Sequence, residues 1–325
     1  MTLRKFAKLI GYSPSTVSKA FSGAKDIREE TRNSIIDSAK ELGLFEHFYK
    51  SSEKTKTVAI IVPEFNSGLY LKIISILSDN LRMQDAITIF SESGFSVKKA
   101  DELISYYSSA KRADGIIVVS KCSPAKKYSA VPIVYLGKRD DPFADSVYSE
   151  WFNGICEVVF NFKLLKHKKI AFIGEKNTEE KEQLVRKAMK FYNLEINENY
   201  VIKSNLRHEA AGYESMKKLF AQNKPPTAIL AAYDDIAIGA MRYAKELGLY
   251  APKNFSIVGM DNSKIASNNN IMLSSVDSHD TEMCELIVNR IMKKIENPNY
   301  CLIQKTEIKS SLITRDSVGI CPVGL

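Results

Sequence analysis

The 325-residue sequence lacks the features that mark membrane-inserted, exported and disulfide-stabilised proteins. No apolar run approaches the ~20 residues of a membrane-spanning helix, and the N-terminal segment MTLRKFAKLIGYS has no long uninterrupted apolar stretch typical of a secretory signal. The five cysteines are scattered, odd in number and never two residues apart, which argues against a disulfide framework and a zinc site. We therefore expect a cytoplasmic protein, not associated with membranes, in which the cysteines are free thiols. They are Cys122, Cys156, Cys284, Cys301 and Cys321.

Signatures of catalysis are also missing. The chain has no glycine-rich phosphate loop, no G-x-S-x-G motif and no histidines at metal-ligand spacing. Its four histidines, His47, His167, His208 and His279, fall in separate segments, and each is expected to be a surface or packing residue. We predict that the protein is not an enzyme and uses no metal or cofactor.

What the chain does have is size and positive charge. With 45% hydrophobic and 26% charged residues, it is long enough to form more than one core. The net charge is +8, and the first acidic residue is Asp26. Basic residues before that point form a concentrated positive patch, which suits a polyanionic partner. They are Arg4, Lys5, Lys8, Lys19 and Lys25.

Three short helices are predicted near the N-terminus. Thr2 can cap the first helix, and Gly11 can end it in a left-handed turn. Ser13 can cap the second, with Pro14 at its first position, where no backbone donor is lost. The third is predicted over residues 29–42, with two glutamates at its positive end. Three helices with a tight turn between the first two form a small helix-turn-helix domain.

The apolar positions of these helices recur every three or four residues and define the expected core of this domain. The inward-facing residues are Leu3, Phe6, Ala7 and Ile10 in the first helix, Val17, Ala20 and Phe21 in the second, and Thr31, Ile35, Ala39 and Leu42 in the third, with Ile36 nearby.

The second predicted helix carries small hydroxyl residues and a lysine where most surface helices carry Glu–Lys pairs. In a helix-turn-helix domain the second helix enters the major groove with its N-terminal residues toward the base edges. We therefore expect Pro14, Ser15 and Lys19 to meet bases. A helix that is merely solvated is the alternative. The whole set of predicted DNA-contacting residues, which includes those expected near phosphates, is Thr2, Lys5, Ser13, Pro14, Ser15, Thr16, Ser18 and Lys19.

The rest of the chain is predicted to be an α/β core. We assign residues 1–45 to the helix-turn-helix headpiece, 46–56 to a linker and 57–325 to the core. Buried apolar runs alternate with amphipathic stretches, which favours parallel sheets flanked by helices, in two lobes with a boundary near residues 166–169. The final segment, LIQKTEIKSSLITR, is expected to cross back between the lobes. The apolar runs are TVAIIVPEF, AITIFSES, GIIVVS, VPIVYLG, KIAFIGE, TAILAAYDD, FSIVGMD and IMLSSV.

The stretches TLRKFAKLIGYSPSTVSKAFSG, IREETRNSIIDSAKELG, KKIAFIG, AAYDDIAIGAMRYAKELGL, FSIVGMDN and LITRDS occur in an order and spacing that resemble the LacI family (LacI/GalR) of bacterial transcriptional regulators. The resemblance implies a repressor that binds near-palindromic double-stranded operator DNA as a homodimer, or as a tetramer of two dimers. It also implies a core like that of periplasmic sugar-binding proteins, with a small-molecule effector between its lobes. An α/β enzyme with an appended DNA-binding module is the alternative function.

The linker departs from that family. Members usually follow the third helix with a Tyr-x-Pro-Asn segment and a hinge helix carrying Ala-Arg and a leucine, which is wedged into the minor groove. Here the segment LGLFEHFYKSSEKTKT has no Pro-Asn and no such leucine. Phe45, Phe48 and Tyr49 are candidates for replacement wedges, or else they pack against the headpiece.

The predicted effector residues follow from the same resemblance. Asp261 matches a family aspartate that accepts hydrogen bonds from effector hydroxyls or amines. Tyr233 replaces a family asparagine, and Asp234 either contacts the effector or caps the following helix. Lys181 replaces an arginine but lacks its planar fork, and it is interpreted as a solvated helix lysine.

Further candidates lie at positions where the family often contacts its ligand. Asn66 and Tyr70 follow the first core strand, and Ser149 and Glu150 replace a frequent Asp-Asn pair, whereas Trp151 is expected to pack in the core. The effector is left open between a modified sugar, a phosphorylated metabolite, a nucleobase and a protein corepressor. The predicted effector-binding residues are Asn66, Tyr70, Ser149, Lys181, Tyr233, Asp234 and Asp261.

Overall fold

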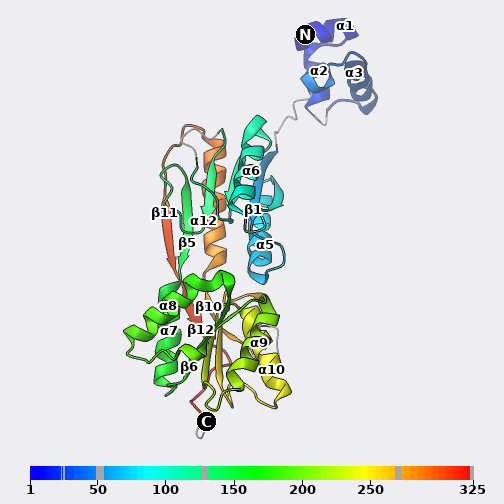
Figure 1. The fold of residues 1–325 in the computed structure, drawn as a ribbon. Helices are drawn as coiled ribbons and strands as arrows, with labels where there is room; N and C mark the ends of the chain where they lie inside the picture. Colours follow the sequence, from blue (N-terminus) through cyan, green and yellow to red (C-terminus); the bar gives the residue numbers. More distant parts are fainter. Residues whose placement is uncertain (23, 25, 49–54, 126–129, 268–271, 323–325) are drawn as a thin grey trace. The chain divides into compact units, whose positions relative to one another are not determined.

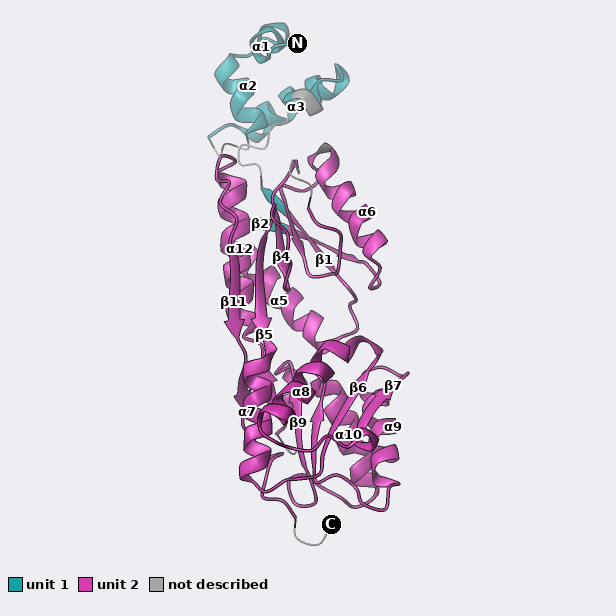
Figure 2. Ribbon diagram, turned by 60° about the vertical axis from the view of Figure 1, so that its left-hand side comes forward, with its two compact units in different colours: residues 1–57, 85–87 teal, residues 58–84, 88–325 magenta. Residues whose placement is uncertain are grey.

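In the computed structural model the chain folds as a helical unit and a larger α/β unit, and residues 1–325 are described apart from 23, 25, 49–54, 126–129, 268–271 and 323–325 (Figure 1). The first unit contains residues 1–57 and 85–87, and the second contains residues 58–84 and 88–325 (Figure 2). Among the described helices, none combines the length and the apolar character needed to cross a membrane.

The N-terminal unit contains the three predicted helices and one further helical turn. Thr2 accepts a hydrogen bond from the Lys5 backbone N at 3.4 Å, and Gly11 takes a left-handed conformation with φ 77°. Ser13 Oγ accepts from the Thr16 backbone N at 3.1 Å. The predicted caps therefore form, because each depends only on a few neighbouring residues. The helices are α1 (Leu3–Ile10), α2 (Pro14–Phe21), α3 (Glu29–Glu41) and α4 (Phe45–Phe48).

The core of this unit is aromatic. The Phe48 ring is 6% exposed and stacks on Phe6, with 5.0 Å between ring centroids, and lies 5.7 Å from the Phe21 centroid. The predicted position of Leu42 is wrong, because this side chain is 48% exposed. Helix α3 ends at Glu41, and the chain after it turns so that Leu44 and α4 pack against the core instead.

The first lobe of the large unit is built on a six-stranded sheet with the order β11-β5-β4-β3-β1-β2. Helix α12 packs on one face, where Gly115 leaves room for Ile291 and Ile295, and α6 packs on the other through Tyr107. The strands are β1 (Lys56–Val62), β2 (Ala86–Glu92), β3 (Gly115–Val118), β4 (Ile133–Leu136), β5 (Asp145–Glu150) and β11 (Lys305–Lys309). The helices are α5 (Gly68–Arg82), α6 (Val97–Ser108) and α12 (Asp280–Glu296), with a 3₁₀ turn at Ser109–Lys111.

The second lobe has a six-stranded sheet with the order β12-β10-β9-β8-β6-β7, in which only the β10–β12 pair recorded for the described residues is antiparallel. The strands are β6 (Ile170–Glu175), β7 (Val201–Ser204), β8 (Ala228–Ala231), β9 (Ser256–Met260), β10 (Ser274–Asp277) and β12 (Ser311–Ile313). The helices are α7 (Trp151–Leu164), α8 (Glu179–Phe191), α9 (His208–Phe220), α10 (Asp234–Glu246) and α11 (Lys264–Ser267), with 3₁₀ turns at Lys176–Thr178 and Glu198–Tyr200.

Helices α9 and α10 are in backbone contact. A Cβ atom on Gly212 would lie 1.8 Å from the Ile236 carbonyl oxygen, and one on Gly239 would lie 1.9 Å from the Glu209 carbonyl oxygen. Because no side chain fits at either position, both glycines are required for this packing. The contact fixes the N-termini of the two helices side by side at the edge of the second lobe that faces the first.

The chain passes between the lobes after β5, after β10 and between β11 and β12, and the predicted crossing back is confirmed. The connections meet: Ser310 Oγ donates to the Glu150 carbonyl at 2.8 Å and accepts from the Gly154 backbone N at 3.0 Å. A Cβ on Gly154 would lie 2.5 Å from Val276 Cγ1. The predicted lobe boundary near residues 166–169 is misplaced, because α7 already packs on α8 and β12 of the second lobe.

Candidate functional sites

The surface of α2 presents the residues predicted to contact DNA. Ser13, Pro14, Ser15, Ser18 and Lys19 are exposed, and Thr16 is half-buried. Ser13 Oγ lies 2.8 Å from both Ser15 Oγ and Thr16 Oγ1, so three hydroxyls gather at the N-terminus of the helix. A helix N-terminus with hydroxyl groups favours binding of phosphate oxygens.

Two further predicted residues, Thr2 and Lys5, are exposed at the start of α1. Lys19 is engaged: its Nζ lies 2.6 Å from Asp26 Oδ2, and this hydrogen bond lowers the pKa of Asp26. Both side chains are exposed, so water and salt screen the pair and a DNA group can displace the carboxylate. Lys25, counted above in the basic patch, lies outside the described residues.

The aromatic residues after α3 serve the headpiece core. Phe48 is buried there, and Phe45 is half-buried with its ring centroid 6.5 Å from that of Phe21. Of the two interpretations, packing against the headpiece therefore holds for Phe48 in this structure. Tyr49 and most of the predicted linker, residues 49–54, lie outside the described residues.

Lys181 is the centre of a cluster of polar and aromatic side chains at the start of α8. Its Nζ donates to Asp261 Oδ1 at 2.8 Å and to the Ala232 carbonyl at 2.9 Å. The same ammonium lies 4.2 Å from the Trp151 ring centroid and 4.6 Å from that of Tyr233. Its side chain is only 14% exposed, so the interpretation as a solvated helix lysine is wrong. Lys181 belongs to the first turn of α8, which directs it toward the ends of the strands.

Asp261 is held in the same place by the end of β9. It is 3% exposed and has φ 99°, a conformation that side-chain-bearing residues rarely adopt. Burial raises the pKa of Asp261 to about 7, against the opposing effect of Lys181. One carboxylate oxygen is therefore committed to an internal cation, and the aspartate does not face the cleft as a free acceptor.

Asp234 has a different environment from either predicted role. Its Oδ2 accepts from the Ser263 backbone N at 2.7 Å and from Ser263 Oγ at 2.9 Å, and its Oδ1 accepts from Ser275 Oγ at 2.6 Å. It is the first residue of α10 and makes no capping bond. Burial raises its pKa to about 6, although these hydrogen bonds oppose the shift. The side chain thus ties α10 to β10 and to the loop after β9.

A cavity of about 460 Å³ is lined by three of the aromatic and polar residues singled out in the sequence, Tyr70, Ser149 and Trp151. Ser149 Oγ is buried and has no hydrogen-bond partner among the described residues. Trp151 both packs on the second-lobe core and borders the cavity, so the expected packing role is only part of its role. The neighbouring Glu150 caps α7, accepting from the Phe152 and Asn153 backbone N at 2.7 and 3.0 Å.

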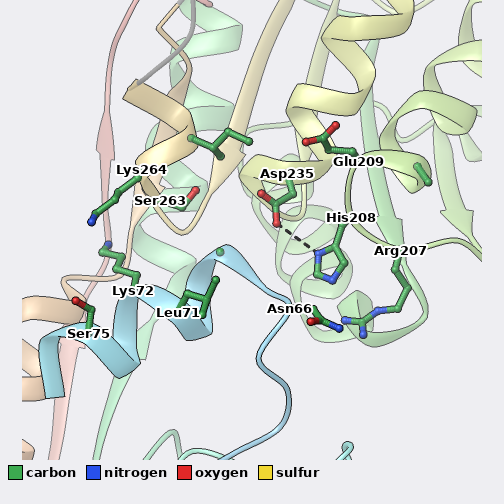
Figure 3. A pocket seen from close by; sticks show the side chains of 13 residues that line it. Asn66, Leu71, Lys72, Ser75, Arg207, His208, Glu209, Asp235, Ser263 and Lys264 are labelled. Carbon is green, nitrogen blue, oxygen red and sulfur yellow. Dashed lines mark ion pairs between the residues drawn. The ribbon is translucent and has the colours of Figure 1, made fainter. Parts of the chain in front are cut away.

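Asn66 lies elsewhere, in a larger hollow of about 740 Å³ shown in Figure 3. Asn66 and Arg207 lie near each other there, and His208 points toward Asp235, with 3.4 Å between Nδ1 and Oδ2. Lys72 borders the opposite side. Asn66 thus lines this hollow, whereas Tyr70 and Ser149 line the cavity of about 460 Å³.

Charged residues that the sequence did not reveal link the two lobes. Arg207 of the second lobe donates to Glu64 Oε2 at 2.5 Å and Oε1 at 2.8 Å, and to Glu175 Oε1 at 3.2 Å. Lys72 of the first lobe donates to the carbonyls of Asp261 and Asn262, each at 3.2 Å. Arg207 lies in the segment SNLRHEAAG, 143 residues from Glu64 in the sequence, so no local sequence spacing predicts that the two residues pair. Within the described part of the chain, no group of three or more His, Cys, Asp or Glu is placed to hold a metal ion.

Comparisons with known proteins agree with this architecture. Residues 161–318 match the family of periplasmic binding protein-like domains. The transcriptional repressor PurR of Escherichia fergusonii is 26% identical over 340 residues, which cover 99% of this chain and 98% of that protein. PurR of Shigella sonnei matches with the same identity and coverage.

Solved structures share the fold over the same length. A complex of the transcriptional regulator CelR with cellobiose has a TM-score of 0.68 and 22% identity, covering 98% of this chain and 99% of that one. The lac repressor dimer bound to operator and the anti-inducer ONPF has a TM-score of 0.73 and 18% identity, with the same coverage. The helix-turn-helix unit, the two-lobed core and these full-length matches agree, and the chain is similar over its whole length to transcriptional regulators of the LacI family.

Proposed function

We propose that this protein is a cytoplasmic transcriptional repressor that binds double-stranded operator DNA as a homodimer. A small-molecule effector, a sugar or a related metabolite, binds between the lobes and changes operator affinity. The observation that carries the proposal is the combination of one capped helix with an exposed hydroxyl-and-lysine surface and one polar, aromatic-lined cleft in the same chain. The full-length similarity to PurR repressors supports a regulator over an enzyme.

The sugar part of the proposal is supported by similar proteins. The CelR structure contains cellobiose, and a LacI-family regulator from Enterococcus faecium, with a TM-score of 0.69 and 19% identity over 82% of this chain and 99% of that one, contains ribose. In this chain the cleft offers Trp151 and Tyr70 as flat surfaces and Ser149 as a hydroxyl donor. A pocket with a few placed polar groups among apolar walls is typical of small-molecule sites.

The ion pair and the hydrogen bonds between the lobes are the element that an effector can bias. Arg207 with Glu64, and Lys72 with the carbonyls after β9, form only while the lobes keep this relative position. An effector that prefers another lobe position must break or shift them, and by linkage it then changes operator affinity in the dimer. Such couplings are typically about 1–3 kcal/mol.

Selection of bound sequences from a random DNA pool tests the proposal. The full-length protein, at a stated salt concentration, should enrich a near-palindromic motif, because a two-fold dimer presents two headpieces. Lys19→Ala should change the motif, whereas Lys40→Ala, an exposed lysine on α3, should leave it unchanged. An unselected pool, or operator affinity that no metabolite changes, would contradict the proposal.

A further inference from the structure

The cavity of about 460 Å³ has a strongly basic end. Lys121 follows β3, and Lys138 and Arg139 follow β4, and all three border the cavity. Strands β3 and β4 are parallel neighbours, so their carboxyl ends lie at the same edge of the sheet. The topology therefore gathers three cationic side chains on the first-lobe side of the cleft.

These positive charges have no carboxylate partners among the described residues. Arg139 Nη2 donates to the Ser120 carbonyl at 2.6 Å, but its Nε is buried without a hydrogen-bond partner. Lys138 Nζ lies 5.7 Å from the Tyr148 ring centroid and in no ion pair of the described structure. A buried N–H without an acceptor is unfavourable, and it is satisfied when a ligand oxygen reaches it.

Nearby carboxylates are engaged elsewhere. Asp140 pairs with Lys305 at 3.1 Å. Asp141 accepts from the Tyr135 hydroxyl at 3.0 Å and from the Phe143 backbone N at 2.8 Å. Asp280, which borders the cavity, lies 3.0 Å from Lys72 Nζ.

Glu180, on the second-lobe side, is the remaining acid of the lining. The cavity lining thus has an excess of positive charge toward β3 and β4, and an anion is the ligand group that such an excess attracts.

The rest of the cavity suits a polar body rather than a second anion. Ser149 Oγ is buried and unpartnered among the described residues, and burial raises the pKa of the Tyr70 phenol, so it remains a proton donor. Lys181, beside Trp151 of the cavity lining, donates to Asp261 Oδ1, so this carboxylate is not a free acceptor for a neutral sugar. The recognition groups that remain available are donors, which match oxygen acceptors.

From these contacts we infer that the effector is a phosphorylated small metabolite, a phosphate monoester of a sugar or polyol. Its phosphate lies between Lys121, Lys138 and Arg139, and its hydroxyl-bearing part extends toward Ser149 and Trp151. This inference rests on the proposed function of the cleft, and it adds the charge and the orientation of the ligand.

Inorganic phosphate is the first probe, used with full-length protein at constant pH and ionic strength against chloride. Phosphate should raise the thermal unfolding midpoint of the wild type, because a ligand that binds the native state stabilises it. The increase should vanish in the double variant Lys138→Met/Arg139→Met. It should persist in Lys190→Met/Lys217→Met, which removes the same charge from exposed positions on α8 and α9.

Calorimetric titration then compares glucose 6-phosphate, ribose 5-phosphate and fructose 6-phosphate with the unphosphorylated sugars. A phosphorylated member should bind at least about tenfold more tightly than its parent sugar, and the double variant should lose that difference. The inference is overturned if phosphate gives no more protection than chloride. It is equally overturned if the parent sugars bind as well as their phosphates, or if the Lys138/Arg139 variant responds like the wild type.

Operator binding separates this inference from the proposed function. The double variant leaves the headpiece unchanged, so without phosphate compounds it should enrich the same DNA motif as the wild type. Loss of the phosphate response with a retained motif concerns only the ligand site. Absence of a motif in every variant concerns the regulator itself.

Discussion

Replacing Lys181 with methionine removes the positive charge beside Asp261 and keeps most of the side-chain volume. The ammonium is the cation bonded to Asp261, which is 3% exposed. Breaking a buried ion pair from one side costs about 3–5 kcal/mol, because the other charge remains buried and unpaired. We expect the free energy of unfolding to fall by about this amount at pH 8.

The loss should depend on pH. The folded pKa of Asp261 is about 7 against an ordinary value of 3.8, and removal of Lys181, which lowers it, moves it higher. The folded state then holds a proton that the unfolded state has released, so stability falls as pH rises from about 4 through the folded pKa. Asp234 and Asp280 face Asp261 and act in the same direction. At pH 5 the carboxyl is neutral, and the variant should be close to the wild type.

Trp151 provides the assay. It is the only tryptophan of the chain, and its ring centroid lies 4.2 Å from Lys181 Nζ. Urea unfolding followed by tryptophan fluorescence at pH 5 and pH 8 gives the two free energies. Lys190→Met, an exposed position on the same helix, should change stability by less than about 0.5 kcal/mol. An equal loss at both pH values, or no recovery at pH 8 when Asp261→Asn is added, would refute the reasoning.

Three other perturbations test the headpiece and the core. Lys19→Ala should weaken operator binding by about 1–3 kcal/mol and relax the sequence preference at one base step. Lys5→Ala should weaken binding to all DNA sequences equally and reduce the slope of the log binding constant against log salt concentration by about 1. Fluorescence anisotropy with operator and random DNA at several salt concentrations distinguishes the two effects. Gly212→Ala should destabilise the second lobe by about 1–3 kcal/mol in urea unfolding, because the new Cβ would lie 1.8 Å from the Ile236 carbonyl oxygen. Gly68→Ala should be tolerated, because the nearest atom to its new Cβ would be 3.6 Å away. Equal effects of the two substitutions would contradict the close packing of α9 on α10. Phe48→Ala should cost the headpiece about 3–5 kcal/mol and abolish operator binding at 37 °C, whereas Phe48→Leu should retain it; full binding by the alanine variant would show that the ring is not part of the core.

Local sequence rules were sufficient where the structure depends on neighbouring residues. The caps at Thr2 and Ser13 and the turn at Gly11 are settled within four residues, and all three form. Leu42 shows the limit of periodicity, because the helix ends one residue before it and the following chain takes over the core position. Strand β5 escaped prediction because four of the six residues in its sequence, DSVYSE, are polar, although its first three residues are buried in the sheet.

The cleft was predicted less completely than the fold. The resemblance brought Lys181, Tyr233 and Asp261 to attention, and the structure brings these three together. It did not show that Lys181 would satisfy Asp261 internally, since that depends on where the first turn of α8 meets the end of β9. Arg207 and Glu64 were missed altogether, because the two residues are 143 positions apart and pair only where the two lobes meet.

The meeting point of the interlobe connections sets how the core can move. Ser310 alone separates β11 from β12, and it is bonded to Glu150 and Gly154 of the adjoining connection. Connections this short do not allow one lobe to slide along the other, so we expect relative motion of the lobes to be a rotation about a hinge at Ser310 and Gly154. The displacement of an atom in such a rotation grows with its distance from the hinge. A small movement beside Gly154 therefore becomes a larger shift at the far end of the first lobe.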